Sequence, residues 1–138
     1  MKGRARGWTR AGILGLAAVL IAGLALPATS MAKAKKVRSE VDFNGLDFPP
    51  PSFPFTFVGN VYAKKPKCVP DRTVNVYRAA DDALAGTAVT DRTGDWRLVP
   101  NPLTPGDYYA EVVKERVGKA GKKLVCKADV SPDFVLPI

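Results

Sequence analysis

The chain has 138 residues, of which 21 are Lys or Arg, 13 are Asp or Glu and none is His, giving a formal net charge of +8. The lack of histidine excludes the usual catalytic triads, and two cysteines are too few ligands for a tetrahedral zinc site. Residues 39–138 carry 13 basic and 13 acidic side chains, so the basic excess belongs to the N-terminal part. The sequence therefore predicts a basic tail and no nucleic-acid binding, which needs basic residues clustered on a folded face.

Residues 1–32 have the organisation of a secretory signal peptide. Four basic residues precede an apolar run over 11–26, and Ser30-Met31-Ala32 presents small residues at the positions that signal peptidase recognises. We expect cleavage near Ala32 and a secreted or cell-envelope protein with no stable membrane span after signal removal. The alternative is an uncleaved anchor, which the basic residues at 33–38 would favour.

Residues 33–55 are predicted to form a disordered basic and Pro/Phe-rich linker. Residues 33–42 are polar and charged, and the prolines at 49–54 cannot donate the hydrogen bonds of a sheet, so an extended segment is expected there. Its phenylalanines would pack on the rim of the following domain or be buried by a partner.

Residues 56–138 alternate strand-like runs with turns rich in Gly, Pro and Asp, and no helical periodicity is present. Strands are predicted over 56–63, 73–78, 84–90, 96–99, 107–115 and 124–126, with an edge strand over 134–136. The length after the leader suffices for one core and not for two. The predicted fold is an all-β, single antiparallel seven-stranded β-sandwich, present as a monomer.

The two cysteines, Cys68 and Cys126, are expected to form a structural disulfide, because an even cysteine count in an exported chain indicates pairing. A bridge over this separation stabilises the fold by about 4 kcal/mol in the chain-entropy model. The alternative of a redox pair would need the CxxC spacing, which this sequence lacks.

The stretch 86–98 contains a turn between two β-prone runs. Asp91 can accept backbone N–H bonds across the turn, and Gly94 can adopt positive φ. Asp91, Thr93 and Asp95 also have the one-three-five spacing of a calcium loop. Trp96 occupies the position where an EF-hand loop needs glycine, so we predict a turn without a metal, and no other cofactor.

Two further markers concern the core. Trp96 lies at an even offset from Gly94 and is expected to face inward as the core anchor. Gly106, after Pro105, supplies a second turn with positive φ, and Tyr108 is expected to pack near Trp96.

Four segments together resemble the carboxypeptidase regulatory-like domain. They are V-G-N-V-Y-A at 58–63, R-T-V-N-V-Y-R at 72–78, G-T-A-V-T-D-R-T-G-D-W at 86–96 and L-T-P-G-D-Y-Y-A-E-V at 103–112. The resemblance covers about residues 57–128 and implies a transthyretin-like sandwich that stabilises, presents or binds. The urate-pathway hydrolase among transthyretin-like proteins uses histidines and a C-terminal Tyr-Arg-Gly-Ser tail, and this sequence has neither.

The expected function is therefore a non-catalytic module for structural support or binding, with an unknown protein or glycan partner. Candidate contact residues are aromatic and arginine side chains of the strands, namely Tyr62, Tyr77, Tyr109, Arg72, Arg78 and Arg97. The alternatives are a glycan-binding adhesion protein, with the basic hairpin at 119–123 as one contact, and a secreted hydrolase with a site of Asp, Glu or Lys side chains.

Overall fold

In the residues that the structure describes, the regular structure consists of β-strands and one short 3-10 helix. The computed structural model describes residues 33–47, 55–119 and 122–136, all within one compact unit spanning Ala32–Ile138. The elements are β1 (Lys35–Val37), β2 (Ser39–Asp47), β3 (Thr56–Ala63), η1 (Pro66–Cys68), β4 (Thr73–Arg78), β5 (Ala83–Val89), β6 (Asp95–Leu98), β7 (Asp107–Val112), β8 (Glu115–Val117), β9 (Leu124–Cys126), β10 (Asp129–Val130) and β11 (Phe134–Val135). The all-β prediction is confirmed.

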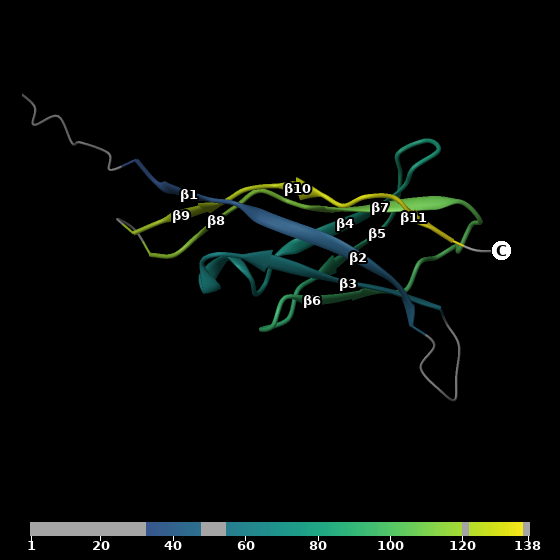
Figure 1. Cartoon of the computed structure of the whole chain (residues 1–138), viewed down its shortest axis with the longest axis horizontal. Helices are drawn as coiled ribbons and strands as arrows, with labels where there is room; N and C mark the ends of the chain where they lie inside the picture. Colours follow the sequence, from purple (N-terminus) through teal and green to yellow (C-terminus); the bar gives the residue numbers. More distant parts are fainter. Residues whose placement is uncertain (1–32, 48–54, 120–121, 137–138) are drawn as a thin grey trace, which may run out of the picture. The chain divides into compact units, whose positions relative to one another are not determined.

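Two antiparallel sheets enclose the core. One has the strand order β10-β7-β4-β5, with β11 also paired to β7, and the other has the order β2-β3-β6 (Figure 1). Side chains alternate between the two faces of each strand, and the inward ones meet between the sheets. The resulting cluster of buried side chains is Val41, Phe57, Val61, Val74, Val76, Ala88, Trp96, Tyr108, Ala110, Val112 and Leu136.

The prediction of a disordered linker is wrong for residues 35–47, which form β1 and β2. Val37, Ser39 and Val41 are buried in period two, while the charged residues between them face solvent. The high charge of this segment hides a strand alternation, and β2 pairs with β3 along its whole length. Residues 48–54 of the predicted linker lie outside the described residues.

A third small sheet has the order β1-β9-β8 (Figure 1). Its β1 strand pairs with β9 in parallel, from Lys35 opposite Leu124 to Val37 opposite Cys126, so the strand pairing is not wholly antiparallel. The single long strand predicted over 107–115 divides into β7 and β8, and β8 pairs with β9 instead of continuing along β4.

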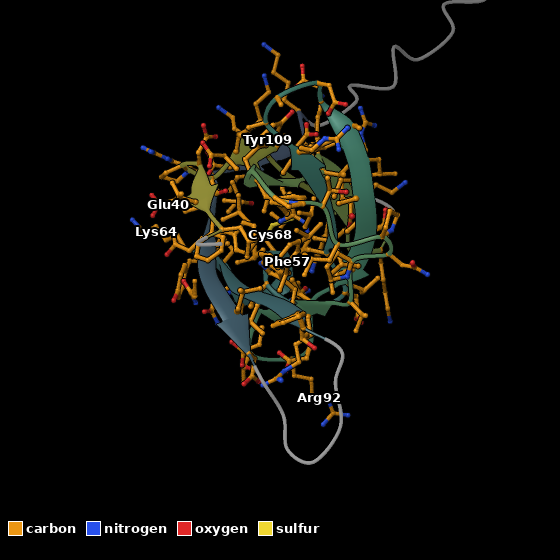
Figure 2. The ribbon with its side chains drawn as sticks, turned by 90° about the vertical axis from the view of Figure 1, so that its right-hand side faces the viewer. Glu40, Phe57, Lys64, Cys68, Arg92 and Tyr109 are labelled. Atoms are coloured by element: carbon orange, nitrogen blue, oxygen red, sulfur yellow. A yellow bond between two sulfur atoms is a disulfide. The ribbon has the colours of Figure 1, made fainter. Side chains whose placement is uncertain are left out.

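The two cysteines are bonded to each other and join η1 to β9. Both are fully buried and pack with Val37 of β1 in a second, smaller hydrophobic cluster. Figure 2 shows Cys68 and Phe57 in the interior, with Arg92 at the periphery. Both hydrophobic clusters and the disulfide lie within residues 37–136, so residues 33–138 contain the complete described core.

Gly59 of β3 allows the Trp96 ring to lie directly against the strand. A Cβ at position 59 would come within 2.1 Å of the Asp42 backbone oxygen and 2.4 Å of the Trp96 ring. We expect Gly59→Ala to lower the free energy of unfolding by roughly 2 kcal/mol, because neither backbone nor a buried ring can move aside freely. Urea unfolding measures this, with the exposed Val89→Ala as the control; equal stability of the two variants would contradict it.

Candidate functional site

The Asp91 turn is held by its own side chains. Asp91 Oδ1 accepts hydrogen bonds from the Thr93 backbone N–H at 2.8 Å, the Thr93 hydroxyl at 2.7 Å and the Asp95 backbone N–H at 3.0 Å. The bonds from Thr93 lower the pKa of Asp91. Gly94 follows with a φ of +93°, and a Cβ there would meet the Val61 backbone oxygen. One carboxylate oxygen of Asp91, Oδ1, is thus used by the turn itself.

The other predicted markers lie in or beside the core. Trp96 and Tyr108 are each 1% exposed and belong to the same cluster, where Phe57 packs on Tyr108 and Phe43 packs on Trp96. Gly106 has a φ of +134° in the loop before β7. These residues position the sheets. Among the described residues, no group of three or more His, Cys, Asp or Glu side chains is placed to hold a metal ion.

Arg72, a predicted surface residue, is instead completely buried. Its guanidinium donates hydrogen bonds to the Ser39 hydroxyl and to three backbone carbonyls, at distances of 2.7 to 3.2 Å. The carbonyls belong to Cys68, Val113 and Lys127. Arg72 therefore joins four separate segments of the chain, and it is a structural residue and not a contact residue.

Glu115 provides the counter-charge for this buried arginine. Its Oε2 lies 3.7 Å from Arg72 Nε, and its Oε1 accepts the Thr73 backbone N–H at 2.8 Å. Burial lowers the pKa of Arg72, and the neighbouring Glu115 carboxylate opposes that change. The pairing of the two residues depends on β8 turning away from the end of β7.

The remaining predicted contact residues do not form one surface. Tyr77 of β4 and Tyr109 of β7 lie side by side on the outer face of their sheet, with ring centroids 5.4 Å apart and planes at 27°. Tyr62 lies on β3 of the opposite sheet, and the side chains of Arg78 and Arg97 are engaged by Asp81 and Asp47. The sheet face around the tyrosines also exposes the aliphatic residues Leu84, Val89, Val130 and Val135.

Tyr109 is expected to stay protonated well above the usual range of a tyrosine. The hydrogen bond of its hydroxyl to Asp82, 2.9 Å long, raises its pKa to about 12. Because the pKa of Tyr109 in the folded protein exceeds the ordinary tyrosine value of 10.0, the contribution of this hydrogen bond to stability is present below pH 10 and is lost as the pH rises toward 12. Ultraviolet titration should show a late tyrosinate that Tyr109→Phe removes, and Asp82→Asn should move this tyrosinate toward pH 10.

A groove lined by lysines lies beside the β1-β9-β8 sheet. Its volume is about 430 Å³, and its lining residues come from three distant segments: Lys35, Lys65, Pro66, Lys67, Lys122 and Leu124. The parallel pairing of β1 with β9 brings the first segment to the third, and the disulfide brings the second segment to both. The four lysines are exposed, and none of the described residues that line the groove is acidic.

The basic residues of the domain are concentrated in the three segments that contain the groove lysines, and the acidic residues lie outside these segments. Residues 33–38, 64–67 and 116–127 contain twelve Lys or Arg and no Asp or Glu, whereas the rest of residues 33–138 contains five basic and 13 acidic residues. We call these three segments the basic pole. The expectation that the excess charge belongs to a disordered tail is wrong, because β1 is a strand of the domain.

The groove could have been found in the sequence from the cysteines. Residues 64–67 directly precede Cys68, and residues 122–127 surround Cys126, so the predicted disulfide already places two basic segments together. The contribution of β1 could not be found in this way, since it depends on a parallel pairing between residues almost ninety positions apart.

Comparison with family models, curated proteins and solved structures finds no match to this chain. In the part of the chain that the structure describes, no helix has the length and apolar character to cross a membrane.

Proposed function

We propose that this protein is an exported, non-catalytic β-sandwich module that supports or binds material at the cell envelope or outside the cell. The observation that carries the proposal is the lysine groove, which is assembled by a buried disulfide. Disulfides of this kind persist in oxidising compartments, which agrees with the signal-like organisation of residues 1–32. Because the groove depends on a disulfide, and disulfides form in oxidising compartments, its assembly favours a function after export.

The proposal includes the carboxypeptidase regulatory-like family and its transthyretin-like, seven-stranded sandwich. Strands β10 and β11 pair with successive parts of the same edge of β7 and are separated by Ser131 to Asp133. Counted as one interrupted strand, they bring the two facing sheets to seven strands. The sequence segments that resemble the family lie on β3, β4, β5, β6 and β7.

The non-catalytic part of the proposal is supported by the distribution of carboxylates. The lysine groove has none, and a second hollow, of about 410 Å³ beside Tyr62, has Glu40 alone. A third hollow, of about 180 Å³ beside Tyr108, is lined by Arg78 and neutral residues. Paired carboxylates for acid and base steps would have to converge on one hollow, so these three favour binding over hydrolysis.

Export and envelope binding can be tested together. The full chain is expressed in a bacterium, and the cytoplasmic, envelope and medium fractions are analysed by intact mass spectrometry without reductant. We expect a form that begins near Ala32 outside the cytoplasm, two hydrogens lighter than the dithiol. It should sediment with isolated envelopes and be released by salt. A reduced, uncleaved chain confined to the cytoplasm would refute the proposed function.

Binding of a neutral glycan is a second candidate, favoured by the outer face of β4 and β7. The Tyr77 and Tyr109 rings form a stacked pair, and the Asn75 amide, bonded to the Thr87 hydroxyl at 2.8 Å, lies next to them. Aromatic rings and amides supply the apolar and polar contacts that sugars require. An array of neutral glycans, probed with the protein and with Tyr77→Ala, tests this candidate; signals that survive the substitution would exclude this face.

A further inference from the structure

We propose that the lysine groove and the surrounding basic pole bind a linear anionic polysaccharide. The inference rests on the proposed function for the compartment in which the ligand is met, and it goes further by assigning a ligand class and a surface. Its physical basis is that the pairing of β1 with β9 and the disulfide bring three basic segments of the sequence together, apart from the acidic residues.

Four lysines line the groove, and none of its described lining residues is acidic. Lys35 comes from β1, Lys65 and Lys67 flank Pro66 at the start of η1, and Lys122 precedes β9. Within the basic pole, Arg38 is held by a carboxylate, Glu40, at 3.5 Å. Such a surface attracts a chain with repeated negative charges, because each lysine can neutralise one charged group along the polymer.

The kind of cation favours an irregular anionic polymer over a fixed phosphate site. Lysine is a flexible point charge, whereas tight recognition of one phosphate commonly uses the planar fork of arginine. All four charged residues of the groove are exposed lysines. Their flexible side chains can pair with sulfate or carboxylate groups at varied spacing along a sugar chain.

Two other polyanions fit the groove less well. Binding of single-stranded nucleic acid uses aromatic side chains on which bases stack, whereas the groove has no aromatic side chain among the lining residues that the structure describes. Binding in a lipid surface uses exposed Trp, Phe or Leu beside the basic residues, whereas the apolar residues here are Pro66 and the half-buried Leu124. A polysaccharide needs neither feature.

The test uses residues 33–138 in oxidised form, with heparin as the probe and dextran as the neutral control. Calorimetric titration should detect heparin binding that weakens as salt is raised, and no binding of dextran. Lys65→Gln with Lys122→Gln should weaken heparin binding by about tenfold or more. Arg92→Gln with Lys114→Gln removes the same charge from exposed sites outside the pole and should change binding by less than about twofold.

Each contrary result overturns a defined part of the inference. Equal loss in the two double variants would show that net charge alone, and not the groove, binds heparin. Tighter binding to duplex or single-stranded DNA, or to phosphatidylserine vesicles, at equal charge concentration would refute a polysaccharide ligand. If the protein is exported but does not bind heparin, this inference is refuted and the proposed function stands. If the chain binds heparin but is confined to the cytoplasm, the proposed function is refuted and this inference stands. Circular dichroism of each variant confirms that its fold is intact.

Discussion

Replacing Arg72 with methionine is expected to lower the free energy of unfolding by about 3 to 5 kcal/mol. The substitution removes every hydrogen bond from the buried guanidinium to the Ser39 hydroxyl and to the three backbone carbonyls. Those acceptors are buried or partly buried and lose their donor, and the Glu115 carboxylate loses its counter-charge. Methionine fills much of the space but satisfies none of these groups.

The measurement is urea unfolding followed by tryptophan fluorescence, with Arg97→Met as the matched control. Arg97 pairs with Asp47 at the surface, where its side chain is 64% exposed, so its loss should cost less than about 1 kcal/mol. If Arg72→Met does not fold, Arg72→Lys gives the same test, since a single ammonium cannot reach all four acceptors. Stability of Arg72→Lys equal to that of Arg97→Met would contradict the structural role of Arg72.

Removal of the disulfide is the second change with a large expected effect. Cys68→Ala with Cys126→Ala should lower the free energy of unfolding by about 4 kcal/mol, because the bridge joins residues 58 positions apart. The loss of stability should be largest in β1 and β9, because these strands pair over few residues and their hydrophobic cluster contains both cysteines. Amide hydrogen exchange should therefore accelerate in these strands before it does in β4 and β7.

The same variant separates the geometry of the groove from its charge. It retains all twelve basic residues of the pole but loses the bond that holds residues 64–67 beside β9. Heparin affinity should fall at unchanged net charge, under conditions where circular dichroism shows that the variant is folded. Urea unfolding of oxidised and of reduced wild-type protein provides the control for stability. Equal stability of the oxidised protein and the double variant would contradict this prediction.

Local sequence determined the strands whose apolar residues alternate clearly. The bounds of β3 and β4 match the predicted ranges, and β5 and β6 differ from theirs by one residue at each end. β-branched residues in period two, such as Val74 and Val76, specify both a strand and the side that faces the core, and these signals need no knowledge of the partner strand. The cysteine pairing was likewise predictable, because two cysteines allow one pairing.

Tertiary structure alone decided the parts that depend on distant partners. Residues 35–47 have a strand alternation, but their charge indicates a tail until β3 and β9 provide the hydrogen bonds of a sheet. An arginine such as Arg72 is ordinarily a surface residue. Its burial follows from bonds to Ser39, Val113 and Lys127, which lie far away in the sequence and which no local pattern reveals. The lysine groove has the same origin. The sequence by itself determined which residues carry the charge. The long-range pairing of β1 with β9, together with the disulfide between η1 and β9, decided that like charges, which repel one another, are held together on one surface.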